Sequence, residues 1–134
     1  MTKKHILVVD DEKNFLATID FILEAANYKV TLIDDGQKAL ETILNYQKQK
    51  IQLDLLITDI RMPHLGGLEL ITTIRKLGIP LPTIVITNHG SRELKRKLEK
   101  QKCVFCLDKP IDDDELLSNV RKLLTGKSDC NKKP

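Results

Sequence analysis

The sequence lacks the features of several protein classes. No apolar stretch in its 134 residues approaches the roughly 20 residues that a transmembrane helix needs. Lys3 and Lys4 precede an apolar run, as in a signal peptide, but two aspartates end that run after Val9. The chain has no internal repeat and no low-complexity block. We therefore expect a cytoplasmic protein that does not associate with membranes.

Cysteine is scarce and poorly spaced for redox or metal chemistry. The chain has three cysteines, which suits a reducing compartment. Cys103 and Cys106 have Cys-x-x-Cys spacing, but residues three apart in a strand point to opposite faces. No second ligand pair is present for zinc. We predict that both are small buried side chains and that Cys130, in a polar tail, is exposed.

Neither sign of charge dominates. The 22 Lys and Arg against 19 Asp and Glu give a net charge of +3, which does not by itself indicate nucleic acid. One expected helix concentrates cations, namely Arg92, Lys95, Arg96, Lys97 and Lys100. We interpret it as a solvated face, the alternative being an output surface for an acidic partner. Direct nucleic-acid binding is disfavoured because no helix-turn-helix follows.

What the chain does have is an alternation of apolar runs and amphipathic stretches. Strands are expected over 6–9, 30–33, 55–58, 83–86 and 104–108, each followed by a helical pattern. The runs alternate little in polarity, as parallel strands covered on both faces do. We predict an α/β fold with a doubly wound five-stranded parallel sheet, flavodoxin-like order 2-1-3-4-5 and helices on both faces. Residues 1–125 would form one domain, and 126–134 a polar C-terminal tail or linker stump.

Residues with capping or helix-breaking preferences mark several helix ends. Asp35 is placed to cap the second helix, and Ser91 the fourth. Gly78 is expected to stop the third. Asp112 and Glu115 have the spacing of a capping box at the start of the fifth.

Polar residues follow four of the apolar runs. Asp10 and Asp11 follow the first run, Asp59 the third, and Lys109 the fifth, while Thr87 ends the fourth. Carboxyl ends of parallel strands share one edge of the sheet, where ligands of open α/β folds bind. Clustered carboxylates repel one another unless a cation lies among them, so the group implies a hard cation such as Mg²⁺.

These residue types suit phosphoryl transfer. Asp59 stands alone at its strand end and is the favoured nucleophile toward a phosphoryl group. Asp10 and Asp11 would hold the metal, while Thr87 and Lys109 would stabilise the transferred group. Taken singly, each residue has a structural alternative, such as a helix cap, a turn or an ordinary strand end. Four strand ends that carry compatible groups in order favour the functional interpretation.

Over roughly residues 4–125, the sequence resembles the receiver domain of bacterial two-component response regulators. The resemblance rests on features in order, which are Ile6 to Glu12, Asp59-Ile60-Arg61-Met62-Pro63 with Gly67, Thr87, and Lys109-Pro110. It implies that Asp59 accepts a phosphoryl group from a sensor histidine kinase or phosphotransfer protein. The chain would then be a signalling domain that catalyses its own phosphorylation and slow dephosphorylation, and not an enzyme acting on other substrates.

The resemblance also implies roles for the surrounding residues. Asp11 would bind Mg²⁺ directly, Asp10 through water, and Arg61 through its backbone carbonyl. Asp59 would be a further metal ligand, and Mn²⁺ is a plausible substitute. Thr87 and Lys109 would contact the phosphoryl group, and the Lys109-Pro110 bond would be cis. Phosphorylation would shift the face formed by the fourth helix, fifth strand and fifth helix, to control a partner or an effector domain. A phosphorylation-dependent dimer is possible in such domains.

The sequence departs from the family pattern in three ways. Cys106 stands where an aromatic residue usually changes rotamer with the threonine, and Phe105 is one place off, on the opposite face of a strand. We predict that this aromatic gate is absent, so that phosphorylation reshapes the output face weakly or differently. Asn88 replaces a small residue. Arg61 and His89 flank the site at positions that tune phosphoryl lifetime, so alanine at both should change dephosphorylation.

Two other functions compete with this one. A hydrolase with an aspartyl nucleophile usually places a second carboxylate two residues after it, but this chain has Arg61 there and no inserted cap. A receiver-like interaction domain that no longer takes phosphate would usually have lost its site residues. All five polar positions are present here, so we favour the signalling domain over both alternatives.

Overall fold

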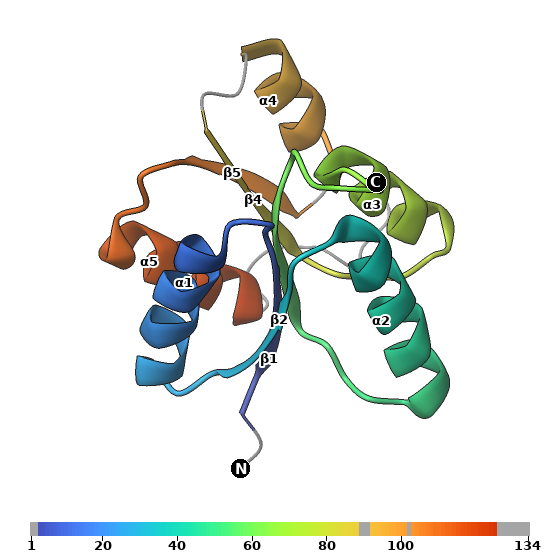
Figure 1. Ribbon diagram of the computed structural model, residues 1–134, viewed down its shortest axis with the longest axis horizontal. Coiled ribbons are helices and arrows are strands. Elements are labelled where there is room, and N and C mark those ends of the chain that lie inside the picture. The colour runs from blue at the N-terminus through green and yellow to red at the C-terminus, as the bar shows by residue number, and fades with distance from the viewer. Residues whose placement is uncertain (1–2, 89–91, 102, 126–134) are drawn as a thin grey trace.

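The computed structural model describes residues 3–88, 92–101 and 103–125, in which five strands alternate with five helices (Figure 1). In chain order these are β1 (His5–Val9), α1 (Lys13–Ala25), β2 (Lys29–Ile33), α2 (Gly36–Gln49), β3 (Leu55–Asp59), α3 (Gly67–Lys76), β4 (Thr83–Thr87), α4 (Arg92–Glu99), β5 (Val104–Asp108) and α5 (Asp113–Leu124). All strand pairs are parallel, in the order β2-β1-β3-β4-β5. The predicted fold class is therefore confirmed. The predicted tail, 126–134, lies outside the described residues.

Helices cover both faces of the sheet (Figure 1). On one face, α1 and α5 pack on Ile6 and Val8 of β1 and on the strands beside it. On the other, α2 and α3 pack on Leu7 and Val9, and Leu98 of α4 extends this layer over β4 and β5. Successive residues of β1 thus serve opposite cores, which explains why its sequence is apolar without alternation.

The helix ends agree with the sequence in part. Asp35 caps α2, because its Oδ1 accepts hydrogen bonds from the N–H groups of Gln37 at 2.7 Å and Lys38 at 3.0 Å. Gly78, with φ of 75°, follows the end of α3 as predicted. Asp112 is the N-cap residue of α5, but its side chain makes no capping hydrogen bond, so the capping box is wrong. The acidic residues in the first turn of α5 still interact favourably with the positive end of the helix dipole. Ser91 lies outside the described residues.

The cysteines correct one expectation. Cys103 and Cys106 do pack against cores on opposite faces of the sheet. Both are half-buried instead of buried, and Cys106 is a free thiol. Cys130 lies outside the described residues. No helix in the described part of the chain is long and apolar enough to cross a membrane.

Candidate functional site

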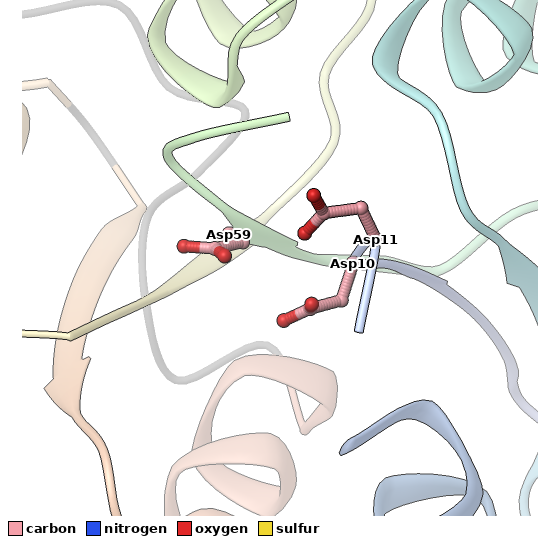
Figure 2. A group of neighbouring side chains, drawn as sticks. All are labelled: Asp10, Asp11 and Asp59. Atoms are coloured by element: carbon pink, nitrogen blue, oxygen red, sulfur yellow. The ribbon is translucent and has the colours of Figure 1, made fainter. Parts of the chain in front are cut away.

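Strand ends bring three carboxylates together at one edge of the sheet. β1 and β3 are neighbours, with Val9 paired to Thr58, so the residues that follow each of these two lie side by side. Asp10 follows β1 directly, and Asp59 is the last residue of β3. Figure 2 shows Asp10, Asp11 and Asp59 gathered there. One carboxylate oxygen of each lies within 4.8 Å of those of the other two. The convergence predicted from the sequence is present.

The three carboxylates differ in their access to solvent. Asp10 is 1% exposed, Asp59 is half-buried and Asp11 is exposed. Asp10 Oδ1 accepts a hydrogen bond of 2.8 Å from the N–H of Glu12, which fixes the carboxylate. Burial raises the pKa of Asp10, although the Glu12 N–H and Lys109 act in the opposite direction. The site therefore holds a charge that is costly to keep buried without a cation.

Lys109 supplies the positive charge at this edge. Its Nζ lies 3.1 Å from Asp10 Oδ2, 3.4 Å from Glu12 Oε1 and 3.6 Å from Asp59 Oδ2. Burial alone lowers the pKa of Lys109, but the bond to Asp10 and the charges of Asp10 and Asp59 leave that pKa above its ordinary value. The ammonium is therefore charged at neutral pH and balances part of the negative charge.

Two side chains to which the sequence assigned no role complete the surroundings of Lys109. Glu12 contributes a carboxylate from the start of α1. The centroid of the Phe15 ring lies 4.2 Å from Lys109 Nζ, which makes the ring a cation–π partner. Phe15 also packs against the core beneath α1 and α5, so its residue type alone points to packing. The contact spans more than ninety residues of sequence and has no local signal.

Close packing after β3 fixes the backbone of Asp59. Its Oδ1 accepts a hydrogen bond of 2.7 Å from the N–H of Ile60. The N–H of Gly67 donates to the carbonyl of Ile60 at 2.8 Å. A Cβ on Gly67 would lie 2.1 Å from the Asp59 carbonyl oxygen, closer than real Cβ contacts allow. The start of α3 is thus pressed against the residue that carries the candidate nucleophile.

Thr87 and Cys106 share one face of the sheet. Val85 and Cys106 are register partners and pack with α3 and α4, while Ile84 and Phe105 pair and pack on the α1–α5 side. Thr87 lies two residues after Val85, and hence on the face of Cys106. Burial, and then the negative charge of Glu99, raise the pKa of the Cys106 thiol to about 11. Cys106 is accordingly a neutral packing residue at physiological pH.

The remaining candidate positions lie around this edge. Arg61 and Asn88 are exposed, and His89 lies outside the described residues. The Lys109-Pro110 bond is cis, as the resemblance implied. Hard divalent cations prefer oxygen ligands, and Asp10, Asp11 and Asp59 together form such a donor set. The residues present therefore fit a Mg²⁺ ion.

Sequence relatives agree with this geometry. The family model for the response regulator receiver domain matches residues 6–121. The transcriptional regulatory protein FixJ of Bradyrhizobium diazoefficiens is 32% identical over 123 residues, which are 92% of this chain and 58% of FixJ. GlrR of Escherichia coli is 33% identical over 116 residues, 87% of this chain and 25% of GlrR. The chain therefore spans only part of the length of these curated relatives.

Solved structures show the same architecture. A response regulator receiver domain protein from Clostridium thermocellum is 27% identical, with a TM-score of 0.80 over 92% of this chain and 96% of that one. The FixJ-N crystal structure is 26% identical, with a TM-score of 0.78 over 93% of this chain and 96% of that one.

Proposed function

Because the chain belongs to the response regulator receiver domain family, we propose that it accepts a phosphoryl group on Asp59 in a Mg²⁺-dependent reaction. The observation that carries the proposal is the meeting of Asp10, Asp11 and Asp59 within 4.8 Å, with the Lys109 ammonium beside them. The donor would be a sensor histidine kinase or phosphotransfer protein. The chain is then a signalling domain that catalyses its own modification and slow hydrolysis, and not an enzyme with a separate substrate.

The surroundings of Asp59 suit an attack on phosphorus. A carboxylate oxygen of Asp59 forms the new bond while the bond from phosphorus to the donor atom breaks, and the leaving group carries away the electron pair. The reaction needs positioning and charge neutralisation more than covalent assistance. Bound Mg²⁺, or Mn²⁺ in its place, would neutralise the oxygens that approach one another. Asp11 would hold it directly, Asp10 through water, and Arg61 through its carbonyl, with Asp59 as a further ligand.

Lys109 and Thr87 would respond to the new charge. Phosphorylation adds nearly two negative charges. The Lys109 ammonium now lies between Asp10, Glu12 and Asp59, so a phosphoryl group on Asp59 offers it a stronger partner without a long movement. Thr87, at the end of β4, would donate its hydroxyl to the same group. The arrangement that binds the added charge best would gain population.

The output face is proposed to be α4, β5 and α5. Cys106 takes the usual aromatic position and packs between α3 and α4, with Phe105 on the other face. We therefore expect the change at this face to proceed without an aromatic rotamer switch. Arg61 and His89 would tune the phosphoryl lifetime. The chain spans 58% of the length of FixJ. The proposal therefore also covers an effector domain or output partner, any phosphorylation-dependent dimer and a cytoplasmic location. We propose no direct nucleic-acid or membrane binding by this domain.

Incubation with acetyl phosphate and Mg²⁺, followed by intact-mass measurement, tests the proposal. We expect the parent protein to gain one phosphoryl group, and Asp59→Asn to gain none. Chelation of Mg²⁺ should prevent the gain in the parent. Circular dichroism of Asp59→Asn would show that the variant is folded.

A folded parent protein without any gain, at time points that exclude rapid turnover, would contradict the proposal. That result would favour an interaction domain that works without phosphate. Equal gains in the parent and in Asp59→Asn would place the modification on another residue.

A further inference from the structure

The loop after Asp59 is fastened to α2 by a pair of side chains that the phosphorylation chemistry does not require. His64, in this loop, contacts Asp35 through Nδ1 and Oδ2. The two residues are 29 positions apart in the sequence. We call this pair the His64–Asp35 clasp. Its imidazole is 72% exposed and its carboxylate 10% exposed, so the contact lies at the rim of the molecule.

Asp35 makes a well-defined anchor for the clasp. Its Oδ1 accepts from the N–H groups of Gln37 and Lys38, which leaves Oδ2 for His64. The N–H of Lys38, and then the His64 imidazole, hold the pKa of Asp35 below its ordinary value. The carboxylate is consequently ionised at neutral pH and fixed at the first turn of α2. The charged groups nearest to it in sequence, Asp34 and Lys38, pair with each other at 3.8 Å.

The loop backbone fits closely against the same turn. His64 has φ of 68°, in the left-handed region that side chains other than Gly, Asn, Asp and His seldom adopt. A Cβ on Gly36 would lie 1.7 Å from the carbonyl oxygen of Leu65, so only glycine permits this approach. The hydrogen bond from Gly67 to Ile60 closes the base of the loop. The loop is thus held at its base by α3 and at its tip by α2.

We propose that His64 is a positioning residue for the divalent cation of this domain, because the clasp pre-sets the backbone of Arg61 for metal binding. The inference rests on the metal site of the proposed function. Arg61 lies three residues before His64, between the two fastened ends of the loop. Met62 and Leu65 also pack against the α2–α3 core and share the work of holding the loop. The clasp therefore adjusts metal affinity and is not required for folding.

The test is a Mg²⁺ titration followed by the amide chemical shifts of ¹⁵N-labelled protein, without a phosphate donor. His64→Gly removes the side chain and keeps the left-handed backbone accessible. Asp35→Ser retains a capping oxygen but is too short to reach His64, and leaves the loop sequence intact. We expect each single variant to raise the half-saturating Mg²⁺ concentration about threefold, as for a solvent-exposed ion pair. The double variant should show no further rise, because both substitutions remove one interaction.

His64→Asn is the matched control. Asparagine tolerates the same backbone conformation, and its amide can donate to Asp35, so its Mg²⁺ affinity should stay near that of the parent. Phosphorylation by acetyl phosphate gives a second measurement. The half-saturating Mg²⁺ concentration should rise in His64→Gly, while the rate at saturating Mg²⁺ stays unchanged. A role limited to fold stability would move the melting temperature and leave this concentration unaltered.

Two outcomes separate the inference from the proposed function. If the parent binds Mg²⁺ and His64→Gly binds it equally well, the inference is wrong and the proposed function stands. If the parent does not bind Mg²⁺, the metal site fails and the inference fails with it. Increases in half-saturating Mg²⁺ concentration that add in the double variant would also contradict the inference, because they would show that His64 and Asp35 act separately.

Discussion

The centre of the sheet and its β5 edge are held to very different degrees. Every residue of β1 and of β4 is buried, whereas in β5 only Val104 is buried and Asp108 is exposed. The helix beside β5 is also lightly attached, since Leu98 is the one buried residue of the eight in α4. The carboxylates that need fixed positions stand on the firm centre. Lys109, which in the proposed function contacts the added phosphoryl group, directly follows the looser edge strand.

The largest expected contrast is in stability. Ile57 in β3 is 1% exposed, so Ile57→Ala should cost about 2–5 kcal/mol in free energy of unfolding, from lost burial and the cavity left behind. Leu94 in α4 is half-buried, and Leu94→Ala should cost roughly 1 kcal/mol. Urea denaturation of both variants measures the difference. Equal losses would show that the edge is packed as firmly as the centre.

A second expected effect concerns the free-energy cost of burying the Asp10 carboxylate. Burial raises the pKa of Asp10, so the folded state holds its proton to higher pH than the unfolded state does. Asp10 therefore contributes to the free energy of unfolding at low pH, and this contribution is lost as the pH rises through the pKa of Asp10 in the folded state. At neutral pH without Mg²⁺, Asp10→Asn should therefore raise the melting temperature by a few degrees.

Asp11→Asn is the control for this effect, because Asp11 is exposed and loses little solvation on folding. Its melting temperature should change less than that of Asp10→Asn. The gain from Asp10→Asn should also shrink in acid, where the parent residue becomes neutral. A lower melting temperature for Asp10→Asn in Mg²⁺-free buffer would mean that the bond to Lys109 outweighs the burial cost.

The opposite end of β1 should respond to pH in the reverse direction. His5 is 4% exposed, with Nε2 2.7 Å from Thr31 Oγ1. Burial, and then the charge of Lys29, lower the pKa of His5. As pH falls below about 6.5, the unfolded state takes up the proton first, so stability is full above this pH and declines through the folded pKa. Urea midpoints of the parent and of His5→Gln over this range measure the contribution. Parallel curves for the two proteins would contradict it.

The smallest expected effect is at the looser edge. Lys95 Nζ in α4 lies 2.6 Å from Asp108 Oδ2 at the end of β5, and both side chains are partly exposed. Lys95→Gln should cost no more than about 1 kcal/mol in global stability. Hydrogen exchange in α4 should nevertheless become faster, because few buried contacts remain there. Exchange at the parent rate would show that the ion pair does not hold the helix.

Much of the fold was predictable because it depends on local patterns. Apolar runs located the strands, and Asp35 and Gly78 marked helix ends through intrinsic capping and backbone preferences. The carboxylate site was predictable because one rule, that parallel strands end at the same edge, brings distant aspartates together. Asp112 shows the limit of such rules, because a correct capping spacing does not decide which way an exposed side chain turns.

The contacts that surround the site were not predictable in the same way. Phe15 over Lys109 and His64 on Asp35 join segments that the sequence pattern treats separately. Each depends on the exact distance between two elements, and side-chain type alone does not give that distance. Phe15 packs against the core and His64 lies in a loop, and neither location identifies the partner of the side chain.

The backbones of Gly67 and Asp59 are packed in direct contact, with no space for a side chain between them. A single added methyl group at Gly67 would meet the Asp59 carbonyl oxygen at 2.1 Å. Because no space separates the two backbones, a displacement of the Asp59 backbone must also displace the first turn of α3. Strain that begins at the end of β3 is thereby passed to a helix instead of being absorbed in a gap. Residues of α3 that touch no phosphoryl group are thus mechanically joined to the one that would carry it.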